Sequence, residues 1–421
     1  MKSNNNFTVS EISSLVKDMV FGSNREEKHQ QIYYLARNNG VFPASIQDLY
    51  MSIGKGKYHG FTVPAINIRG ITYEVARAVF RAAARTQTSF FIFEIARSEI
   101  EYTRQTPGEY SACILAAALA EKYQGPVFIQ GDHVQIRRRR FFNDEESELN
   151  QVKDLIKEQI DAGFYNIDID ASTLVDVDKP TLEEQQELNG KITAELTSFI
   201  RSLGPGSITI SVGGEIGEIG KGNSTPEDLR AFMKIYSRYL PPDMQGISKI
   251  SVQTGTSHGG IVLPDGSIAK INVDFKILTE LSNLARKEYG MGGAVQHGAS
   301  TLPDNLFHLF PEAGALEIHL ATGFQNIIFD SPAFPSDLKK KILGELAIKY
   351  SSERKPGDTD AQFFYRTRKR AFGDFKLELW SLPEENLRAI ISELEERFIL
   401  LFNELKVAGT DWIIKELYRS Q

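Results

Sequence analysis

The stretch IQGDHVQ (residues 129–135) is an apolar run that ends on Asp132 and His133. Three later apolar runs also lead directly into a side chain that can bind a metal. These runs are ITISVGG, ISVQTGTS and GGAVQ, and they are followed by Glu215, His258 and His297. One histidine after a strand carries little information. Four such ends within one repeating pattern indicate that the fold gathers them at a single place.

The repeating pattern starts at residue 61, where apolar runs begin to alternate with amphipathic segments. The runs expected to be strands are 61–68, 89–96, 126–132, 164–172, 207–214, 246–254, 292–296 and 314–322. They are apolar on both faces, which is typical of parallel strands covered by helices. Eight strand–helix units in about 250 residues predict an α/β fold, the (β/α)8 TIM barrel. A doubly wound sheet is the alternative, because periodicity does not reveal whether the sheet closes.

The pattern divides the chain into three expected regions: one before it, the pattern itself and one after it. Residues 1–60 predict an N-terminal helical segment with loops, and residues 61–334 predict the catalytic barrel. Residues 335–421 lack the strand–helix rhythm and predict a C-terminal helical extension. We expect this extension to pack on the barrel or on a partner subunit.

The composition is that of an ordinary globular protein. The 421 residues have a net charge of −7, with acidic and basic residues interspersed, which argues against a nucleic-acid partner. No run approaches the roughly 20 apolar residues of a membrane span. The single cysteine, Cys113, excludes an internal disulfide and fits a reducing compartment. The expectation is a cytoplasmic protein without a membrane segment.

Active sites of TIM barrels lie at the C-terminal ends of the strands. The sequence places polar or small residues at these ends: Asn67, Glu94, Asp132, His133, Asp170, Ser172, Glu215, His258, His297, Thr322 and Gly323. Three imidazoles and one carboxylate among them suit Zn²⁺ or another divalent ion. Glycines next to the three histidines allow close approach to a ligand. Taken singly, a histidine is more often a core or loop residue than a metal ligand.

Several of these residues have more than one interpretation. Asp132 can act as a base beside His133 only if the chain bends there, since successive strand residues face opposite ways. Otherwise it orients a ligand imidazole. The segments after the last two strands, HGAST and HLATGFQN, are candidates for phosphate binding, or plain turns. The run 137–140 of four arginines either clamps an anionic substrate or forms a solvated or intersubunit face, and His319 is ambiguous.

The same motifs resemble those of the class II, metal-dependent fructose-bisphosphate and tagatose-bisphosphate aldolases. The similar segments run in order: VPAINI, GDHVQ, GGEIGEIG, GTSHGG and QHGAS. The resemblance implies zinc held by three histidines, an accessory carboxylate ligand and a proton-transferring aspartate. The implied zinc ligands are His133, His258, His297 and Glu215, and the implied proton carrier is Asp132. The implied sugar-phosphate contacts are Asn67, Gly259, Gly298, Ser300 and Thr322, with Gly323 beside them. The resemblance also implies a cytoplasmic homo-oligomer.

The chain departs from that family in several places. In HLAT, His319 and Ala321 stand where the family has an Asn and an Asp. The family's lysine after the strand-six histidine is missing, and Glu218 is the candidate acid in the glycine-rich loop 214–224. That loop has no P-loop signature and reads as a mobile active-site loop or a connector. The segment EIARSEIEYTRQTPGEY is similar to GatZ/KbaZ-type tagatose-bisphosphate aldolase subunits, which act with a partner subunit.

The leading hypothesis is therefore a zinc-dependent lyase that acts on a ketose bisphosphate, fructose 1,6-bisphosphate or tagatose 1,6-bisphosphate. The first alternative is a metal-dependent sugar epimerase, with Glu94 and Asp132 as the acid and base. The second is a non-catalytic partner subunit of an aldolase. Three retained histidines argue against the second alternative, because a scaffold needs no metal.

Overall fold

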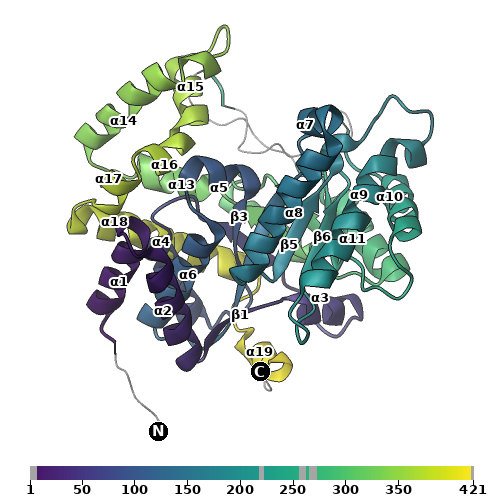
Figure 1. Ribbon diagram of the computed structural model, residues 1–421, viewed down its shortest axis with the longest axis horizontal. Helices are drawn as coiled ribbons and strands as arrows, with labels where there is room; N and C mark the ends of the chain where they lie inside the picture. The colour runs from purple at the N-terminus through teal and green to yellow at the C-terminus, as the bar shows by residue number, and fades with distance from the viewer. Residues whose placement is uncertain (1–6, 218–221, 256–261, 265–272, 419–421) are drawn as a thin grey trace.

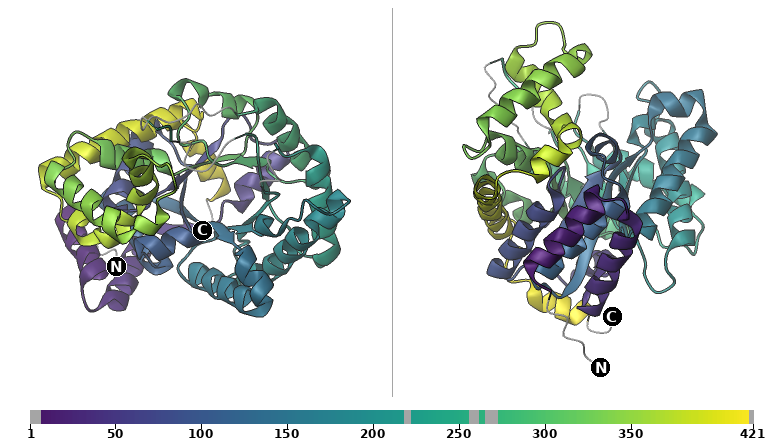
Figure 2. Two further views of the ribbon diagram at one scale, coloured as in Figure 1. Left: turned by 90° about the horizontal axis from the view of Figure 1, so that it is seen from above. Right: turned by 60° about the vertical axis from the view of Figure 1, so that its left-hand side comes forward.

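The computed structural model describes residues 7–217, 222–255, 262–264 and 273–418. Eight parallel strands pair in chain order, and the last pairs with the first, so the sheet closes into a ring (Figures 1 and 2). The strands are β2 (Val63–Asn67), β3 (Ile92–Ala96), β4 (Gly125–Gln135), β5 (Asn166–Asp170), β6 (Ser211–Glu215), β7 (Lys249–Val252), β8 (Ala294–Gln296) and β9 (Glu317–Leu320). This confirms the predicted TIM barrel and excludes the doubly wound sheet.

Helices surround the ring and bury one face each against it. They are α4 (Thr72–Thr86), α5 (Arg97–Thr103), α6 (Pro107–Ala120), α7 (Arg138–Asn143), α8 (Glu145–Asp161), α9 (Leu182–Leu203), α10 (Pro226–Tyr239), α11 (Phe275–Tyr289), α12 (Leu309–Glu312) and α13 (Thr322–Asp330). In α4, Val75 and Val79 are buried, whereas Arg77 binds Glu121 at 2.7 Å near the surface. Every residue of β2, β3 and β5 is buried, as expected for strands covered on both faces.

The N-terminal segment packs along the side and at one end of the barrel. Helices α1 (Val9–Phe21) and α2 (Arg25–Asn38) pack beside α6. A short strand, β1 (Val41–Ala44), pairs in parallel with the start of β4, and α3 (Gln47–Gly54) follows it. The helical and loop prediction for residues 1–60 missed β1. It has only four residues and includes a proline, which is typical of an edge strand and gives a weak sequence signal.

The C-terminal extension packs on the barrel of its own chain. Its helices are α14 (Ser336–Lys349), α15 (Asp360–Thr367), α16 (Ala371–Asp374), α17 (Lys376–Trp380), α18 (Glu384–Glu404) and α19 (Asp411–Leu417). Helix α18 lies along α4 and α13, and α14 to α16 rise over the end of the barrel opposite α3 (Figure 2). Helix α19 returns to the α3 end, where the Tyr418 hydroxyl donates to the Ser45 carbonyl at 2.6 Å. Among the described residues, no helix is both long and apolar enough to span a membrane.

Candidate active site

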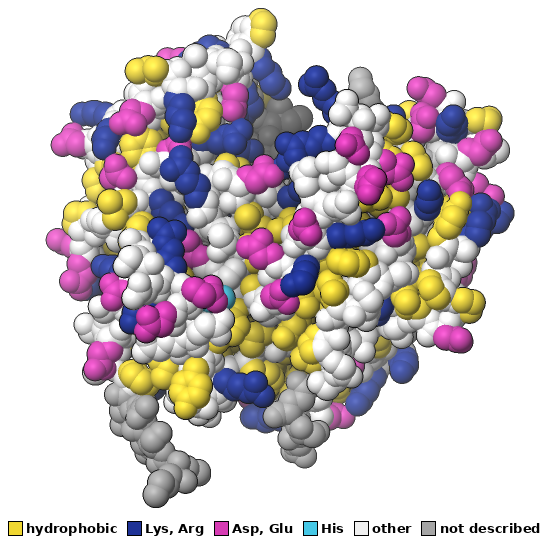
Figure 3. Space-filling view, viewed as in Figure 1, with side chains coloured by type: hydrophobic (Ala, Val, Ile, Leu, Met, Phe, Trp, Pro, Cys, Tyr) yellow, Lys and Arg dark blue, Asp and Glu magenta, His cyan; other side chains and the backbone are white. Residues whose placement is uncertain are grey.

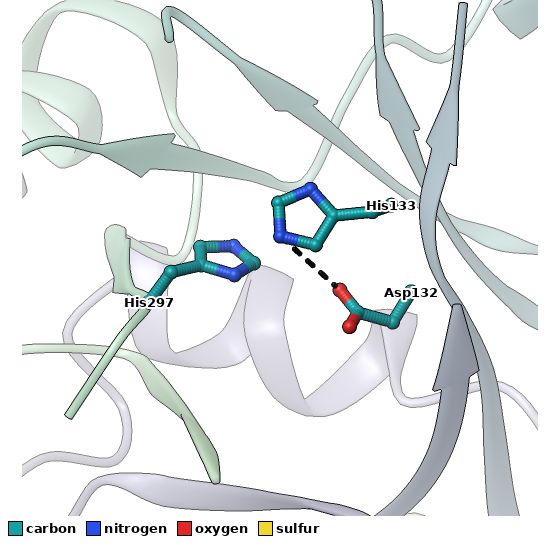
Figure 4. Close-up of side chains that lie close together, drawn as sticks. All are labelled: Asp132, His133 and His297. Atoms are coloured by element: carbon teal, nitrogen blue, oxygen red, sulfur yellow. Dashed lines mark ion pairs between the residues drawn. The ribbon is translucent and has the colours of Figure 1, made fainter. Parts of the chain in front are cut away.

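A bulge in β4 brings Asp132 and His133 to the same place. The pairing of β4 with β5 shifts between Gly131 and Val134, and His133 has a φ of 38°. An extra residue of this kind bends a strand and redirects its side chains. His133 Nε2 lies 3.9 Å from Asp132 Oδ1, and both side chains line one cavity (Figure 4). The bend required for both residues to act together is therefore present.

The imidazole of His297 faces His133 from the opposite side of the barrel mouth. Their ring centroids are 4.3 Å apart, and His297 Nε2 is 2.9 Å from the Ser251 hydroxyl of β7. One ligand atom each from Asp132, His133 and His297 lies within 4.8 Å of the others, and Figure 4 shows the three side chains converging. The structure thus gathers three of the predicted site residues from two strand ends.

Two carboxylates flank His133 on its other side. Its Nδ1 lies 3.3 Å from Asp170 Oδ2 and 3.1 Å from Glu215 Oε2. Burial acts to lower the pKa of His133, but the charges of Asp132 and Glu215 raise it well above its usual value. Burial and the charge of Asp170 raise the pKa of Glu215 to about 7. Burial opposes ionisation of Asp170, but hydrogen bonds from His133, Ser172 and Gln135 lower its pKa.

His319 is the site residue whose role the sequence left ambiguous. Its Nδ1 lies 3.0 Å from Glu94 Oε2 and 3.2 Å from Asp132 Oδ1, and its ring centroid lies 4.0 Å from that of His297, with the rings tilted by 42°. Burial and the charge of Asp132 raise the pKa of Glu94 to about 8. One signal was available in the sequence: strand residues alternate, so a polar Glu317 and His319 point to the same face.

The cavity at the C-terminal ends of the strands measures about 230 Å³. Eight residues predicted for the site line it: Asn67, Glu94, Asp132, His133, His297, Gly298, Ser300 and Thr322. The sequence did not point to several other lining residues, among them Arg69, Arg97, Glu99, Tyr102, Gln135 and Lys369. Of the arginine run 137–140, only Arg137 is part of the lining.

The predicted phosphate-binding residues lie together. Asn67 donates to Glu99 at 2.6 Å, and Ser300 Oγ accepts from the Ala321 amide at 2.7 Å. A Cβ at Gly323 would come within 2.7 Å of the Ser300 carbonyl, so these two loops touch closely. The predictions for Glu218, His258 and Gly259 lie outside the described residues.

The donor set of this site fits a divalent cation. Glu215 and Asp170 are at strand ends next to the imidazole of His133, and within the described ranges neither has a Lys or Arg ion-pair partner. Carboxylates left without a compensating cation in a buried site are unfavourable. Mixed nitrogen and oxygen donors are those that Zn²⁺ and similar ions accept.

Comparison with known proteins extends over most of the chain. Residues 48–363 match the family model described as "Fructose-bisphosphate aldolase class-II". No curated protein matches significantly. Among solved structures, the YdjI aldolase from Escherichia coli K12 is 15% identical with a TM-score of 0.51, over 88% of this chain and 99% of that one.

Two other solved structures share the fold. A probable tagatose 6 phosphate kinase from Sinorhizobium meliloti 1021 is 14% identical, with a TM-score of 0.55 over 84% of this chain and 93% of its own. Fructose-bisphosphate aldolase from Campylobacter jejuni is 18% identical, with a TM-score of 0.52 over 88% and 97%. At these identities the likeness concerns the fold alone.

Proposed function

The chain belongs to the class II fructose-bisphosphate aldolase family, and from this premise we propose that it is a zinc-dependent lyase that cleaves a ketose bisphosphate by retro-aldol chemistry. Fructose 1,6-bisphosphate and tagatose 1,6-bisphosphate are the candidate substrates. The observation that carries the proposal is the convergence of Asp132, His133 and His297 within 4.8 Å at the wall of one cavity. As in the family, we expect a cytoplasmic homo-oligomer.

In this proposal His133 and His297 hold the zinc, together with His258 and with Glu215 as an accessory ligand. When bound, the ion supplies a Lewis acid that polarises the ketose carbonyl. Asp170 holds the imidazole of His133 in place, since its Oδ2 is 3.3 Å from Nδ1 and its Oδ1 accepts from Ser172 at 2.6 Å. Ser251 does the same for His297.

Asp132 is the residue we assign to proton transfer. It lines the cavity next to His133, and its Oδ1 lies 3.2 Å from His319 Nδ1. It accepts the proton of the substrate hydroxyl whose carbon becomes the aldehyde carbon, while His319 steadies the carboxylate. His319 therefore replaces the family's asparagine with a group that contacts the base.

The sugar phosphate binds, in this proposal, where the loops after β8 and β9 meet. Gly298, Ser300 and Thr322 line the cavity there, and α13 begins at Thr322, so its first amides are available to an anion. Two buried oxygens in the lining, Asn67 Oδ1 and Glu94 Oε1, have no hydrogen-bond partner among the described residues. They are placed to contact sugar hydroxyls.

A second candidate function is a metal-dependent sugar epimerase. The observation that favours it is the pair formed by Glu94 and Asp132, which approach the same His319 nitrogen at 3.0 and 3.2 Å. Two carboxyl groups in one cavity can give and take a proton on one carbon. A non-catalytic partner subunit is the third candidate, and it makes no use of the metal donors.

Release of triose phosphate distinguishes these functions. The assay supplies fructose 1,6-bisphosphate or tagatose 1,6-bisphosphate, with zinc or with a chelator. It compares the wild type with His297→Ala and with the control His308→Ala, whose side chain lies at the surface and is 42% exposed. The expected result is release that chelation and His297→Ala abolish and His308→Ala preserves. Stoichiometric metal without triose release from either sugar would reject the lyase. A change in the ketose without triose release would then identify the epimerase.

A further inference from the structure

The C-terminal extension reaches the cavity through one side chain, Lys369. This lysine lies in the short 3-10 helix η4 (Arg368–Arg370), between α15 and α16, and lines the same cavity as Asp132 and His297. In Figure 1, α16 stands beside α5 and α13, at one side of the barrel. The extension is therefore part of the cavity wall.

Close packing fixes the extension just after Lys369, at Phe372 and Gly373. Gly70, which follows β2, touches the ring of Phe372, and any Cβ at Gly70 would overlap that ring. Gly373 touches the carbonyl of Tyr102 so closely that a Cβ there would overlap it as well. These contacts require glycine and position η4 against the barrel.

Polar contacts also hold the segment around Lys369 to the barrel. Before Lys369, Arg368 donates to Asn326 at 2.6 Å and pairs with Asp330 at 2.8 Å, both in α13. After it, Asp374 pairs with Arg104 at 2.6 Å. The segment that carries Lys369 is thus held to both neighbouring barrel elements, and its ammonium group is presented by a fixed backbone.

The charge of Lys369 is not balanced within the part of the chain that the structure describes. Arg69, which also lines the cavity, pairs with Glu99 at 2.7 Å, and Asn67 binds the other oxygen of Glu99 at 2.6 Å. Lys369 has neither an ion pair nor a hydrogen bond there, and its Nζ lies 5.5 Å from the ring centroid of Tyr102. Burial, followed by the charges of Arg69 and Arg370, lowers the pKa of Lys369. A bound anion would offset the free-energy cost of burying the positive charge of Lys369.

The surroundings of the cavity are also basic. Arg97 and Arg137 belong to its lining. Figure 3 shows Lys and Arg side chains gathered on both sides of the notch between the extension and α7. Glu94, Glu99 and Asp132 also line the cavity, so these basic side chains attract anions to its entrance rather than along its whole wall.

We propose that Lys369 and Arg69 form an anion-binding subsite in the cavity, which takes a phosphate ester group of the substrate. The identity of the substrate rests on the proposed function, whereas the binding of an anion at this subsite does not. Arg69 presents a planar guanidinium already oriented by Glu99 and Gln325, the latter at 3.0 Å. Lys369 adds a second positive charge from the extension, so substrate recognition depends on residues beyond the barrel.

Inorganic phosphate titrated into the full-length protein tests this subsite without turnover. Lys369→Gln is expected to weaken phosphate binding by about tenfold to a hundredfold, the usual effect of losing a charged hydrogen-bond partner. Lys369→Arg should retain most of the affinity. The matched control is Lys340→Gln on α14, whose side chain is 81% exposed, and it should bind as the wild type does.

Steady-state kinetics adds a second readout with the substrate. Lys369→Gln should raise KM for the bisphosphate by a similar factor and change kcat much less, because the group binds substrate and does not touch the reacting atoms. Should Lys369→Gln fail to fold, Lys369→Met replaces it in both assays. Unchanged phosphate affinity in the folded variant would overturn the subsite, even in an active lyase. Weakened phosphate binding without lyase activity would support the subsite and reject the proposed function.

Discussion

Two clusters of buried charge occupy the same barrel, and they are balanced in different ways. Toward the α3 end, Lys249 of β7 pairs with Asp168 at 3.0 Å and with Glu317 at 2.6 Å, and it donates to Gln130 at 2.7 Å. At the mouth, Glu215 and Asp170 both lie against the imidazole of His133, and neither has a Lys or Arg ion-pair partner within the described ranges. The first cluster contains a lysine, whereas the second contains no Lys or Arg among the described residues and has metal-binding side chains instead. This difference separates a structural network from a ligand site.

His319 lies at the boundary between the two clusters. Its Nε2 lies 2.6 Å from Glu317 in the inner cluster, and its Nδ1 lies 3.2 Å from Asp132 at the mouth. Burial opposes its protonation, but Glu94 and Asp132 raise its pKa well above the usual value. The imidazole therefore contributes positive charge to both sides, which an asparagine at this position could not do.

The largest effect is expected from removing the inner cation. Lys249→Met leaves Asp168 and Glu317 buried without their partner, and loss of one member of a buried pair costs about 3–5 kcal/mol. The free energy of unfolding, measured by urea denaturation of the metal-free protein, should fall by that amount. Lys415→Met, which removes an exposed pair with Asp411 at 3.1 Å, should cost under about 0.5 kcal/mol. Equal losses in the two variants would contradict the structural role of the inner cluster.

A smaller free-energy change, but a specific one, is expected at the mouth. His133→Ala removes a proposed metal ligand. Loss of a residue that only supports a ligand already lowers metal affinity about 10–100-fold, so we expect loss of the ligand itself to lower zinc affinity by at least about 100-fold. Zinc content after dialysis against a competing chelator measures this. The control is His59→Ala, an exposed loop histidine. Zinc retained by His133→Ala at the wild-type level would show that the metal binds elsewhere.

A third effect is a pH dependence of stability at the boundary. Glu94 has a pKa of about 8 in the folded protein, above its usual 4.5, so the folded state retains a proton that the unfolded state loses. The resulting stabilisation is complete below pH 4.5 and disappears as the pH rises through 8. Glu94→Gln mimics the protonated form at every pH.

The free energy of unfolding of Glu94→Gln, relative to the wild type, should therefore rise between pH 5 and pH 8. Urea denaturation at four pH values in that range measures the trend. Glu385→Gln, in the exposed first turn of α18, serves as the control and should follow the wild type at each pH. A difference that stays flat or declines over this range would assign the proton to a neighbour.

The barrel was predictable because each strand and helix has a recognisable local pattern of apolar and polar residues. Runs that are apolar on both faces, such as β3, need no knowledge of distant residues to be recognised. The ends of β4 and β8 were predictable for the same reason, and so were His133 and His297 as candidates. The four-residue β1 was missed, because its pairing with β4 depends on the tertiary fold.

The wider cavity was not predictable from local patterns. The bulge that turns both Asp132 and His133 inward appears only in the pairing of β4 with β5. Likewise, Lys369 stands in a basic, aromatic stretch whose local pattern does not point to a cavity. Its position follows from the fit of Phe372 on Gly70 and of Gly373 on Tyr102, which are contacts between distant segments. Residue spacing carries no information about such contacts.

The closure of the ring by β9 has a consequence for the order of events during synthesis. Since β9 supplies the pairs with both β2 and β8, a nascent chain cannot complete the sheet until Leu320 has emerged from the ribosome. Lys369 and Tyr418 emerge later still, the first at the mouth and the second at the opposite end. The scaffold and its final lining residue are thus finished at separate moments of translation.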